Sequence, residues 1–444
     1  MKAGRFAVNA VIIFVLLSFA LSGCGGGGGG SDQISPSNKA DSSGLSRNPV
    51  PQAAASVTQS VVNASNALGI ALLKQVSTNN AVVAPFRASL SLARLRAGAA
   101  GETKNGISQV MNLDAAADVD DAFNSLDLAV GDRIASASLG GQTSQASSRG
   151  WVQKRYGYLL TYLDNMAQNY GLQMAGVDYA LAQSDAWTTI SNWSSTASGG
   201  FSGTLNLSQD TRLVLGDALR LNAAWESPFD AAQTKTDWFQ LLDGNYEEVT
   251  FMRRQGAIST TSVDGYAAYE LPAGGNGLTF LIIVPEKDRY NEVVSSLTAT
   301  KLTQIVTALT PAVIDLMLPK FTIAGSTVDL SVGNGAQKDV ADFSALDGTK
   351  DLYVMSKAHN AKFAVNESGL QGSSVTLLGL DDAHPETWTN PGSDGSYGVI
   401  IYNGSIDYTI PVAQVAIGRP FIFLVRDSFS GVVLFIGRVL NPAE

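Results

Sequence analysis

Apolar residues recur at helical spacing early in the chain and follow strand-like spacing later. The helical pattern covers residues 57–74, 89–95 and 151–170, and residues 80–85 form a short β-like run. Strand-like runs follow at residues 213–221, 249–252, 278–284, 314–318, 362–366, 421–425 and 432–436. Helices come mainly first and strands mainly later, and no internal repeat is present. The pattern therefore predicts an α+β fold rather than a series of βαβ units.

The first 23 residues have the character of an export signal. Lys2 and Arg5 precede an apolar run over residues 7–21, which is too short to span a membrane comfortably. The run ends in Leu-Ser-Gly-Cys, and Cys24 is the only cysteine of the chain. This ending resembles the bacterial lipobox, whose cysteine is diacylated and becomes the mature N-terminus. We therefore expect residues 1–23 to be a lipoprotein signal, although an ordinary signal peptide with an incidental cysteine is the alternative.

A stretch of low complexity follows the cysteine. Glycine fills residues 25–30, and Ser, Asn, Pro and Gln then dominate to about residue 55. Such a composition cannot bury enough apolar surface to fold, so residues 24–55 are expected to be a lipid anchor and flexible tether. The folded domain is then residues 56–444. A lipidated Cys24 predicts a secreted protein anchored to the bacterial cell envelope, at the outer membrane or the cell surface.

The composition narrows the function classes. The chain has 444 residues, of which 45% are hydrophobic and 15% charged, as in globular proteins. A formal net charge of −10 disfavours nucleic-acid binding, because phosphates require positive charge. Two histidines and one cysteine exclude internal disulfides and leave little for a zinc site, so no metal and no cofactor is expected.

Signatures of catalysis are largely missing from the sequence. There is no G-x-S-x-G elbow, no H-E-x-x-H and no phosphate loop. A Ser-His-Asp hydrolase would have to use His359 or His384 as its base, and no serine elbow accompanies either. The sequence therefore predicts a protein that is not an enzyme. A hydrolase is a remote hypothesis, ranked third after the two given below.

Several sequence blocks, in order and across almost the whole body, resemble the serpin family of protease inhibitors. The resemblance lies in Asn-Ala-Val-Val-Ala-Pro at 80–85, Gly-Ala-Ala-Gly-Glu-Thr at 98–103, Ile-Ser-Asn-Trp at 190–193, the run from 213 to 230, Leu-Pro-Lys-Phe at 318–321, Ala-Asp-Phe-Ser at 341–344 and the ending from 419 to 442. It implies a single domain with three β-sheets, eight to nine helices and a protruding reactive loop, here at about 367–418.

Membership of that family implies a suicide-type inhibitor of serine, sometimes cysteine, endopeptidases. The protease attacks the loop and forms an acyl-enzyme, and the cut loop then inserts as a new strand into the large sheet before the ester is hydrolysed. The partner would be the target endopeptidase, and the inhibitor would be a monomer. A non-inhibitory serpin that serves as a binding or scaffold lipoprotein of the envelope is the alternative.

The loop hinge can be tested against the physics of strand insertion. Residues 366–376 resemble the family sequence N-E-E-G-T-E-A-A-A-A-T, and residues 369–380 contain no charge and no proline, as a central strand requires. Alternation places Leu370, Gly372, Ser374, Thr376, Leu378 and Leu380 on one inward face. By the resemblance, the hinge residues are Glu367, Gly369, Leu370, Gly372, Ser374 and Thr376. Leu370 is larger than the family residue at its position, and Gly372 is more flexible than the family residue at its position. Both replacements are expected to slow insertion.

Family spacing places the reactive bond between Ala383 and His384. The register is open by several residues, so Leu380, Asp381 or Asp382 are alternatives for the residue that the protease reads. No Lys or Arg occurs between residues 362 and 419, which favours chymotrypsin-, elastase- or subtilisin-like targets over trypsin-like ones.

The chain also departs from the family pattern. The stretch from Gly369 to Pro420 is about twice the usual length, and residues 385–410 are read as an insertion that forms an extra hairpin, an exosite or a disordered loop. Residues 114–132 are acidic where some relatives bind heparin, so no heparin activation is expected.

The positions that control opening of the sheet in the family correspond to Ala84, Arg87, Asp217 and His359. Two neutral family residues are charged here, because Arg87 takes the place of a serine and Asp217 that of an asparagine. We therefore expect an Arg87–Asp217 ion pair near His359.

Overall fold

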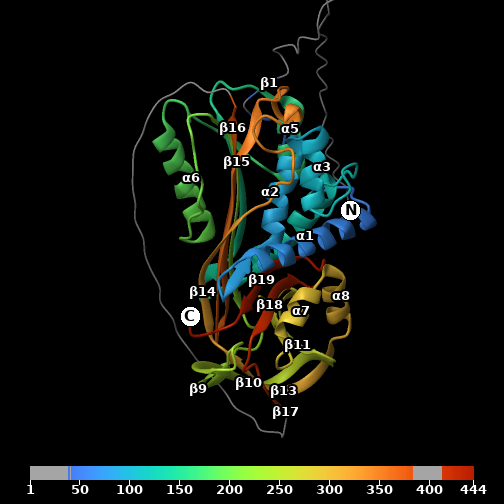
Figure 1. Ribbon diagram of the computed structural model, residues 1–444, viewed down its shortest axis with the longest axis vertical. Coiled ribbons are helices and arrows are strands. Elements are labelled where there is room, and N and C mark those ends of the chain that lie inside the picture. Colours follow the sequence, from blue (N-terminus) through green and yellow to red (C-terminus); the bar gives the residue numbers. More distant parts are fainter. Residues whose placement is uncertain (1–38, 41, 384–412) are drawn as a thin grey trace, which may run out of the picture. The chain divides into compact units, whose positions relative to one another are not determined.

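The computed structural model of the chain describes residues 39–40, 42–383 and 413–444 (Figure 1). The expected lipidation residue Cys24, His384 of the expected reactive bond and the expected insertion 385–410 lie outside the described residues. Within the described residues there are nine helices, 19 strands, and no helix long and apolar enough to cross a membrane.

The helices are concentrated in the first half of the chain. They are α1 (Ala55–Gln75), α2 (Pro85–Gly98), α3 (Gly101–Val110), α4 (Asp120–Ser136), α5 (Leu160–Tyr170), α6 (Gln183–Ser198), α7 (Tyr290–Ser296), α8 (Ala299–Thr307) and α9 (Ser344–Asp347). The strands before residue 230 are β1 (Lys39–Ala40), β2 (Ala81–Val83), β3 (Ser138–Leu139), β4 (Gln142–Thr143), β5 (Gln145–Gln153), β6 (Tyr158–Leu159), β7 (Met174–Val177) and β8 (Thr211–Ala224).

The second half of the chain is dominated by strands, as the sequence pattern predicts. They are β9 (Asp230–Gln240), β10 (Tyr246–Val263), β11 (Tyr266–Ala273), β12 (Leu278–Pro285), β13 (Thr310–Pro319), β14 (Phe321–Asp329), β15 (Leu352–Asn366), β16 (Gly369–Asp382), β17 (Ala413–Ala416), β18 (Phe421–Asp427) and β19 (Val433–Val439).

The strands form two large sheets and two small two-stranded ones. The six-stranded sheet has the order β14-β15-β16-β8-β5-β7, so β16 is a central strand. The second sheet has nine strands, because the 18-residue strand β10 pairs with β9 and β13 over its first part and with β11 near its end. If the nine-stranded sheet is counted as two sheets that share β10, the six-stranded sheet is the third. This is the expected three-sheet α+β architecture.

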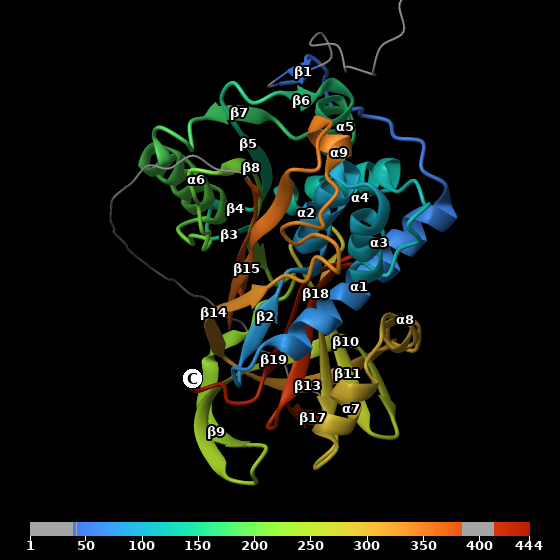
Figure 2. The ribbon, with the colours of Figure 1, turned by 45° about the horizontal axis from the view of Figure 1, so that its top comes forward.

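Helices cover both faces of the six-stranded sheet (Figures 1 and 2). Helix α6 lies on one face and helix α2 on the other, and both pack against β8 and β16. The side chains of the α2 face belong to the large core that also contains β12, β18 and β19, whereas the α6 face has a separate smaller core. A strand inserted at the position of β16 therefore enters two apolar layers at once.

The helix predicted over residues 151–170 is wrong in its first half. Residues up to Gln153 complete β5, where Trp151 is paired with Val214 of β8, and only Leu160–Tyr170 is helical. Pairing with a buried neighbouring strand overrides the local helical periodicity of this segment.

Ordered contacts begin before the expected end of the tether at residue 55. Strand β1 pairs with β6, and the Ser43 hydroxyl donates to Asp164 of α5 at 2.6 Å. The Arg47 Nε donates to Asn124 of α4 at 2.7 Å, and its guanidinium lies 3.0 Å from the Asp127 carboxylate. The amide of Asn48 donates to the carbonyl of Gln168. Polar pairing rather than apolar burial holds this segment, so its polar composition did not reveal the contacts.

Candidate functional site: the inserted hinge strand

The segment expected to be the hinge of a protruding loop lies inside the six-stranded sheet as β16. It is antiparallel to both neighbours, with a register from Gly369↔Asn366 to Asp382↔Leu352 on β15 and from Gly369↔Ala224 to Asp381↔Thr211 on β8. The backbone groups of this strand are therefore paired on both sides. This placement differs from the expected protruding loop. The segment can pair with strands on both sides because it contains no charge and no proline over residues 369–380.

One face of β16 enters the large core. Leu370, Leu378 and Leu380 are fully buried there. Leu370, which was expected to hinder insertion because of its size, is thus accommodated without exposure. The Ser374 hydroxyl is buried with no hydrogen-bond partner among the described residues, so this position carries an uncompensated polar group.

The structure gives Gly372 a steric role. A Cβ atom at this position would lie 2.7 Å from the ring of Phe435 and 2.9 Å from the ring of Phe363. These rings pack on each other with their centroids 5.3 Å apart, so they cannot easily give way. Inserted β16 therefore requires glycine at residue 372, and backbone flexibility is only part of the reason.

The other face of β16 lies beneath α6 and the segment that follows it. Val375 and Leu377 belong to the smaller core, and the Ser373 hydroxyl donates to the carbonyl of Ser198 at 2.8 Å. A Cβ atom on Gly203 would come within 2.6 Å of Val375. The cover over β16 is thus closely fitted to the inserted strand.

The entry of the strand is held by Glu367. Its carboxylate lies 3.0 Å from the Lys320 ammonium and accepts a hydrogen bond from Thr234 at 2.8 Å, and its carbonyl accepts from the Phe229 amide. Burial raises the pKa of Glu367, but the hydrogen bonds and the Lys320 charge outweigh it and leave the pKa below its ordinary value. The Glu367 carboxylate is therefore ionised, and its contacts with Lys320 and Thr234 anchor the turn before β16.

Of the four sheet-opening positions, Ala84 and His359 are joined directly. The Ala84 amide donates to His359 Nε2 at 2.9 Å, and His359 Nδ1 lies 2.8 Å from the Thr376 hydroxyl of β16. Because Nε2 accepts, the proton of the neutral ring is assigned to Nδ1, which donates to Thr376. Burial lowers the pKa of His359 to about 4, so the ring is neutral near pH 7.

The expected Arg87–Asp217 ion pair is wrong. Arg94 occupies that position instead, with its Nη1 2.5 Å from the Asp217 carboxylate, which also accepts from Ser91 at 2.5 Å and Ser148 at 2.6 Å. Both charged side chains are fully buried. Arg94 lies two turns beyond Arg87 on α2, and this places it opposite the middle of β8, where Asp217 lies.

Arg87, in the first turn of α2, pairs with Asp127 of α4 at 2.5 Å. Asp127 also binds Arg47 of the N-terminal segment. Burial raises the pKa of Asp127, yet the Arg87 and Arg47 charges hold it below its ordinary value. The Asp127 carboxylate therefore pairs with two guanidinium groups, that of Arg87 in the sheet-opening region and that of Arg47 in the chain before α1.

The far end of β16 carries the residues expected next to the reactive bond. Asp381 accepts hydrogen bonds from Ser208 and Thr211, at 2.6 and 2.8 Å, and burial raises its pKa. The Ala383 amide donates to the carbonyl of Asp351 at 3.0 Å. Ala383 thus lies at the end of the inserted strand, whereas His384 is outside the described residues.

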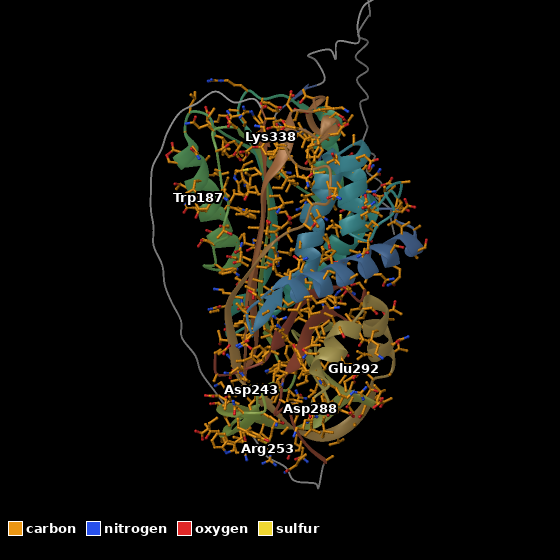
Figure 3. All side chains as sticks on the ribbon, viewed as in Figure 1. Trp187, Asp243, Arg253, Asp288, Glu292 and Lys338 are labelled. Atoms are coloured by element: carbon orange, nitrogen blue, oxygen red, sulfur yellow. The ribbon has the colours of Figure 1, made fainter. Side chains whose placement is uncertain are left out.

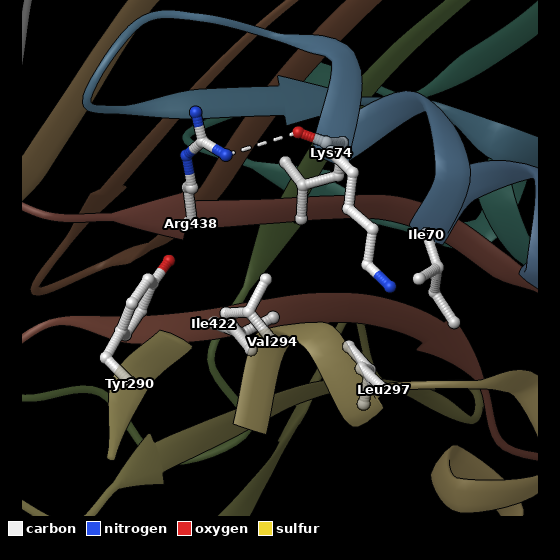
Figure 4. A pocket seen from close by; sticks show the side chains of 8 residues that line it. Ile70, Lys74, Tyr290, Val294, Leu297, Ile422 and Arg438 are labelled. Carbon is white, nitrogen blue, oxygen red and sulfur yellow. Dashed lines mark hydrogen bonds between the residues drawn. The ribbon is translucent and has the colours of Figure 1, made fainter. Parts of the chain in front are cut away.

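A small pocket elsewhere in the molecule is separate from β16 (Figure 4). It lies between α1, α7, β18 and β19, and its lining residues are Ile70, Leu73, Lys74, Tyr290, Val294, Leu297, Ile422 and Arg438. Arg438 closes one side by donating to the carbonyl of Leu73 at 3.3 Å. None of these residues belongs to the hinge or to the sheet-opening region, so the pocket adds nothing to the site.

Sequence reasoning missed several residues that shape this site, namely Arg94, Asp127, Arg47, Phe363 and Phe435. Of these residues, only Arg94 of α2 could be suspected from the sequence, because a charged residue in an otherwise apolar helix needs a buried partner. The partners themselves are distant in sequence, as Asp217 is from Arg94, and no local pattern identifies them.

Comparisons with known proteins agree with this geometry. The family described as Serpin (serine protease inhibitor) matches residues 63–442. Leukocyte elastase inhibitor A of Mus musculus is 26% identical over 387 residues, which cover 82% of this chain and 94% of that protein. An uncharacterized serpin-like protein of Thermococcus kodakarensis is 26% identical over 396 residues, which cover 86% of each chain.

Solved structures share the fold. Cleaved Serpin 42Da superposes with a TM-score of 0.71 at 21% identity, covering 87% of this chain and 99% of that one. A loop-inserted, cleaved ovalbumin mutant gives a TM-score of 0.72 at 19% identity, covering 86% and 100%. With the family match extending from α1 to the C-terminal strands, this chain belongs to the serpin family, whose members are mostly protease inhibitors.

Proposed function

We propose that this serpin inhibits serine endopeptidases by a suicide mechanism based on the segment that forms β16. The observation that carries the proposal is the pairing of residues 369–382 with both β15 and β8, over the whole length that lies before the reactive bond. Buried backbone hydrogen bonds contribute roughly 1 kcal/mol each, and both faces of the strand also enter apolar cores. Backbone pairing and apolar burial thus both favour insertion.

The chemistry proceeds in two stages. The catalytic serine of the protease attacks the carbonyl carbon of Ala383, the amine of His384 leaves with a proton, and an ester joins the two proteins. Insertion of residues 369–382 then carries the ester to the far end of the six-stranded sheet before water hydrolyses it. The fitted sites for Leu370, Gly372 and Thr376 favour this second stage.

The target is proposed to be an elastase- or chymotrypsin-like protease. The residue before the reactive bond is Ala383, with Leu380 as the nearest larger apolar residue, and no basic residue lies in β16. Relatives named as leukocyte elastase inhibitors fit this preference. The anchor is proposed to be a lipid on Cys24, which would hold the inhibitor at the bacterial cell envelope.

The test is incubation of the protein with elastase, chymotrypsin, subtilisin, papain and trypsin, followed by denaturing gels and intact mass. A covalent complex that survives denaturation, together with release of a peptide beginning at His384, is expected for the first two proteases. Ala383→Arg should transfer trapping to trypsin, whereas Leu380→Arg should yield cleavage three residues earlier without efficient trapping.

Cleavage without any complex would contradict the inhibitory proposal. The alternative, a binding or scaffold serpin of the envelope, would then follow if cleavage also left the melting temperature unchanged. The preparation should retain the chain from residue 38, because residues 39–54 contact the body.

A further inference from the structure

The last two residues of β16, Asp381 and Asp382, both carry a carboxylate. Asp381 is only 2% exposed, whereas the side chain of Asp382 is 17% exposed. We propose that the hydroxyls of Ser208 and Thr211 form a receptor for the Asp381 carboxylate, and that this receptor admits the end of the hinge strand by offsetting the burial of its charge. The inference deepens the proposed function, on which it rests, because it names side chains that complete the insertion of the same segment.

A shift in strand register selects the partner of Asp381. Along β8 the pairing passes from Leu380↔Leu213 directly to Asp381↔Thr211, so one residue of β8, Arg212, is left out of the ladder. An unshifted ladder would place Arg212 opposite Asp381. The bulge therefore puts a hydroxyl, rather than a guanidinium, beside the buried carboxylate.

The chain around both hydroxyls directs their protons to the carboxylate. The Ser208 hydroxyl donates to one oxygen of Asp381 at 2.6 Å, and the fully buried Thr211 hydroxyl donates to the other at 2.8 Å. The Ser208 Oγ accepts the Asp210 amide, and the Thr211 Oγ1 accepts the Ser208 amide, each at 3.0 Å. Because each hydroxyl oxygen already accepts an amide, its own proton is free to bond Asp381. The two donors thus suit a group that only accepts, which is an ionised carboxylate.

The neighbouring guanidinium of Arg212 is engaged elsewhere. It lies 3.2 Å from the Asp382 carboxylate and 5.6 Å from the centre of the Tyr156 ring, over which it stacks. In the part of the chain that the structure describes, no Lys or Arg forms an ion pair with Asp381. Direct compensation of the buried Asp381 charge therefore comes from the two hydroxyls, whereas Arg212 compensates Asp382.

The titratable and charged groups that face Asp381 come from each element packed against it. They are Asp210 before β8, Arg212 in β8, Asp382 in β16, Tyr353 in β15 and Tyr179 after β7. Lys338, which Figure 3 labels, lies over the ring of Tyr353 with its Nζ 6.0 Å from the ring centre.

These surroundings leave the burial of Asp381 incompletely compensated. Burial raises the pKa of Asp381 and the Asp382 charge adds to the rise, whereas the hydroxyl donors and Arg212 lower it. The resulting pKa lies above the ordinary value, so the contribution of this group to stability is fully present in acid and is lost as the pH rises through the raised pKa. Removal of one hydroxyl donor would raise the pKa further and extend this loss to higher pH.

The experiment uses the full chain, expressed with its own leader and purified in detergent. Every variant carries a recognition sequence for a viral cysteine protease directly after Ala383 and is cut there once, as intact mass verifies. Hydrogen exchange of the Asp382 and Ala383 amides, which donate to the carbonyls of Asp210 and Asp351, reports whether the end of the strand is inserted. Urea unfolding of the cut chain is then measured at pH 5 and pH 8.

Thr211→Val is expected to raise the equilibrium constant for unfolding about tenfold at pH 8, because it removes a charge-assisted hydrogen bond, and by a smaller factor at pH 5. Thr211→Ser keeps the donor and should stay within about twofold of the natural chain. When Asp381→Asn is also present, the effect of Thr211→Val should fall to about threefold or less, because the charge is gone.

Thr349→Val is the matched control. The Thr349 hydroxyl donates at 2.8 Å to Asp347, which is a buried aspartate outside β16. Its replacement should have the same effect with and without Asp381→Asn.

The inference is overturned if Thr211→Val acts equally with and without Asp381→Asn, or if its effect does not change with pH. It is also overturned if the effect of Thr349→Val depends on Asp381 as strongly. Unprotected Asp382 and Ala383 amides in the cut natural chain would overturn the proposed function together with this inference. Protected amides without the coupling would overturn this inference alone, so the two failures are distinguishable.

Discussion

The Nδ1 atom of His359 lies 2.8 Å from the hydroxyl of Thr376, so a fixed strand of the sheet is bonded directly to the strand that enters it. The same imidazole accepts the Ala84 amide through Nε2. The ring therefore links β15, β16 and the start of α2. Its bonding pattern requires a neutral histidine, because a proton on Nε2 would displace the amide donor.

The first prediction concerns the pH dependence of the inserted form. Burial lowers the pKa of His359 to about 4, so the unfolded chain binds this proton first as the pH falls below 6.5. Stability is therefore expected to be fully present above pH 6.5 and to fall toward pH 4, by up to about 3 kcal/mol from this group. His359→Gln should flatten this part of the profile in thermal melts between pH 4 and 8.

Carboxylates also titrate in that range, but their contribution is common to both proteins and cancels in the difference. Equal slopes in the natural protein and the His359→Gln variant would show that the buried imidazole does not control the acid sensitivity.

The second prediction concerns Gly372. Replacement by alanine places a methyl group within 2.9 Å of the two packed rings of Phe363 and Phe435, and overpacking of this kind costs about 1–3 kcal/mol. Gly372→Ala should lower the melting temperature of the cleaved, inserted form and turn part of the inhibitor into substrate. Gly379→Ala is the matched control, because its nearest neighbours are 3.4 and 3.5 Å away. An equal effect of both variants would refute the steric explanation.

The third prediction concerns Ser374. Its hydroxyl is fully buried without a partner among the described residues, and leaving such a group unpaired costs about 1–3 kcal/mol. Ser374→Ala should therefore stabilise the inserted form by about 1 kcal/mol and accelerate insertion. Denaturant unfolding of the cleaved protein measures the first effect, and stopped-flow fluorescence measures the second. A loss of stability would mean that the hydroxyl is satisfied.

The fourth prediction concerns the carboxylate shared by two arginines. Arg87 is almost fully buried, so Arg87→Ala leaves Asp127 poorly compensated and should cost about 3–5 kcal/mol. Arg47 is partly exposed, so Arg47→Ala should cost only about 1 kcal/mol. Chemical denaturation checks both values.

A double-mutant cycle of Arg47→Ala with Asp127→Asn should show coupling, because the two groups share a direct contact. Arg289→Ala, which removes a partly exposed arginine with its own surface ion pairs, is the control and should change stability little. Strict additivity of Arg47 and Asp127 would rule out the pairing.

The sequence alone predicted most of the architecture. The strands at 213–221, 278–284 and 421–425 lie where the hydrophobic pattern placed them, within β8, β12 and β18. The segment 369–380 was identifiable as insertable because charge and proline are absent from it, and these are requirements that any central strand imposes locally. The α+β class followed from the same periodicities.

Only the tertiary structure decided which groups meet. Asp217 contacts Arg94 and not Arg87, because Arg94 lies seven residues further along α2, opposite the middle of β8. Gly372 is required by Phe435, 63 residues away and on another sheet. Whether residues 369–382 protrude or insert also depends on hydrogen bonds with two distant strands. Local sequence determines what a segment can form, whereas contacts between distant residues select among those forms.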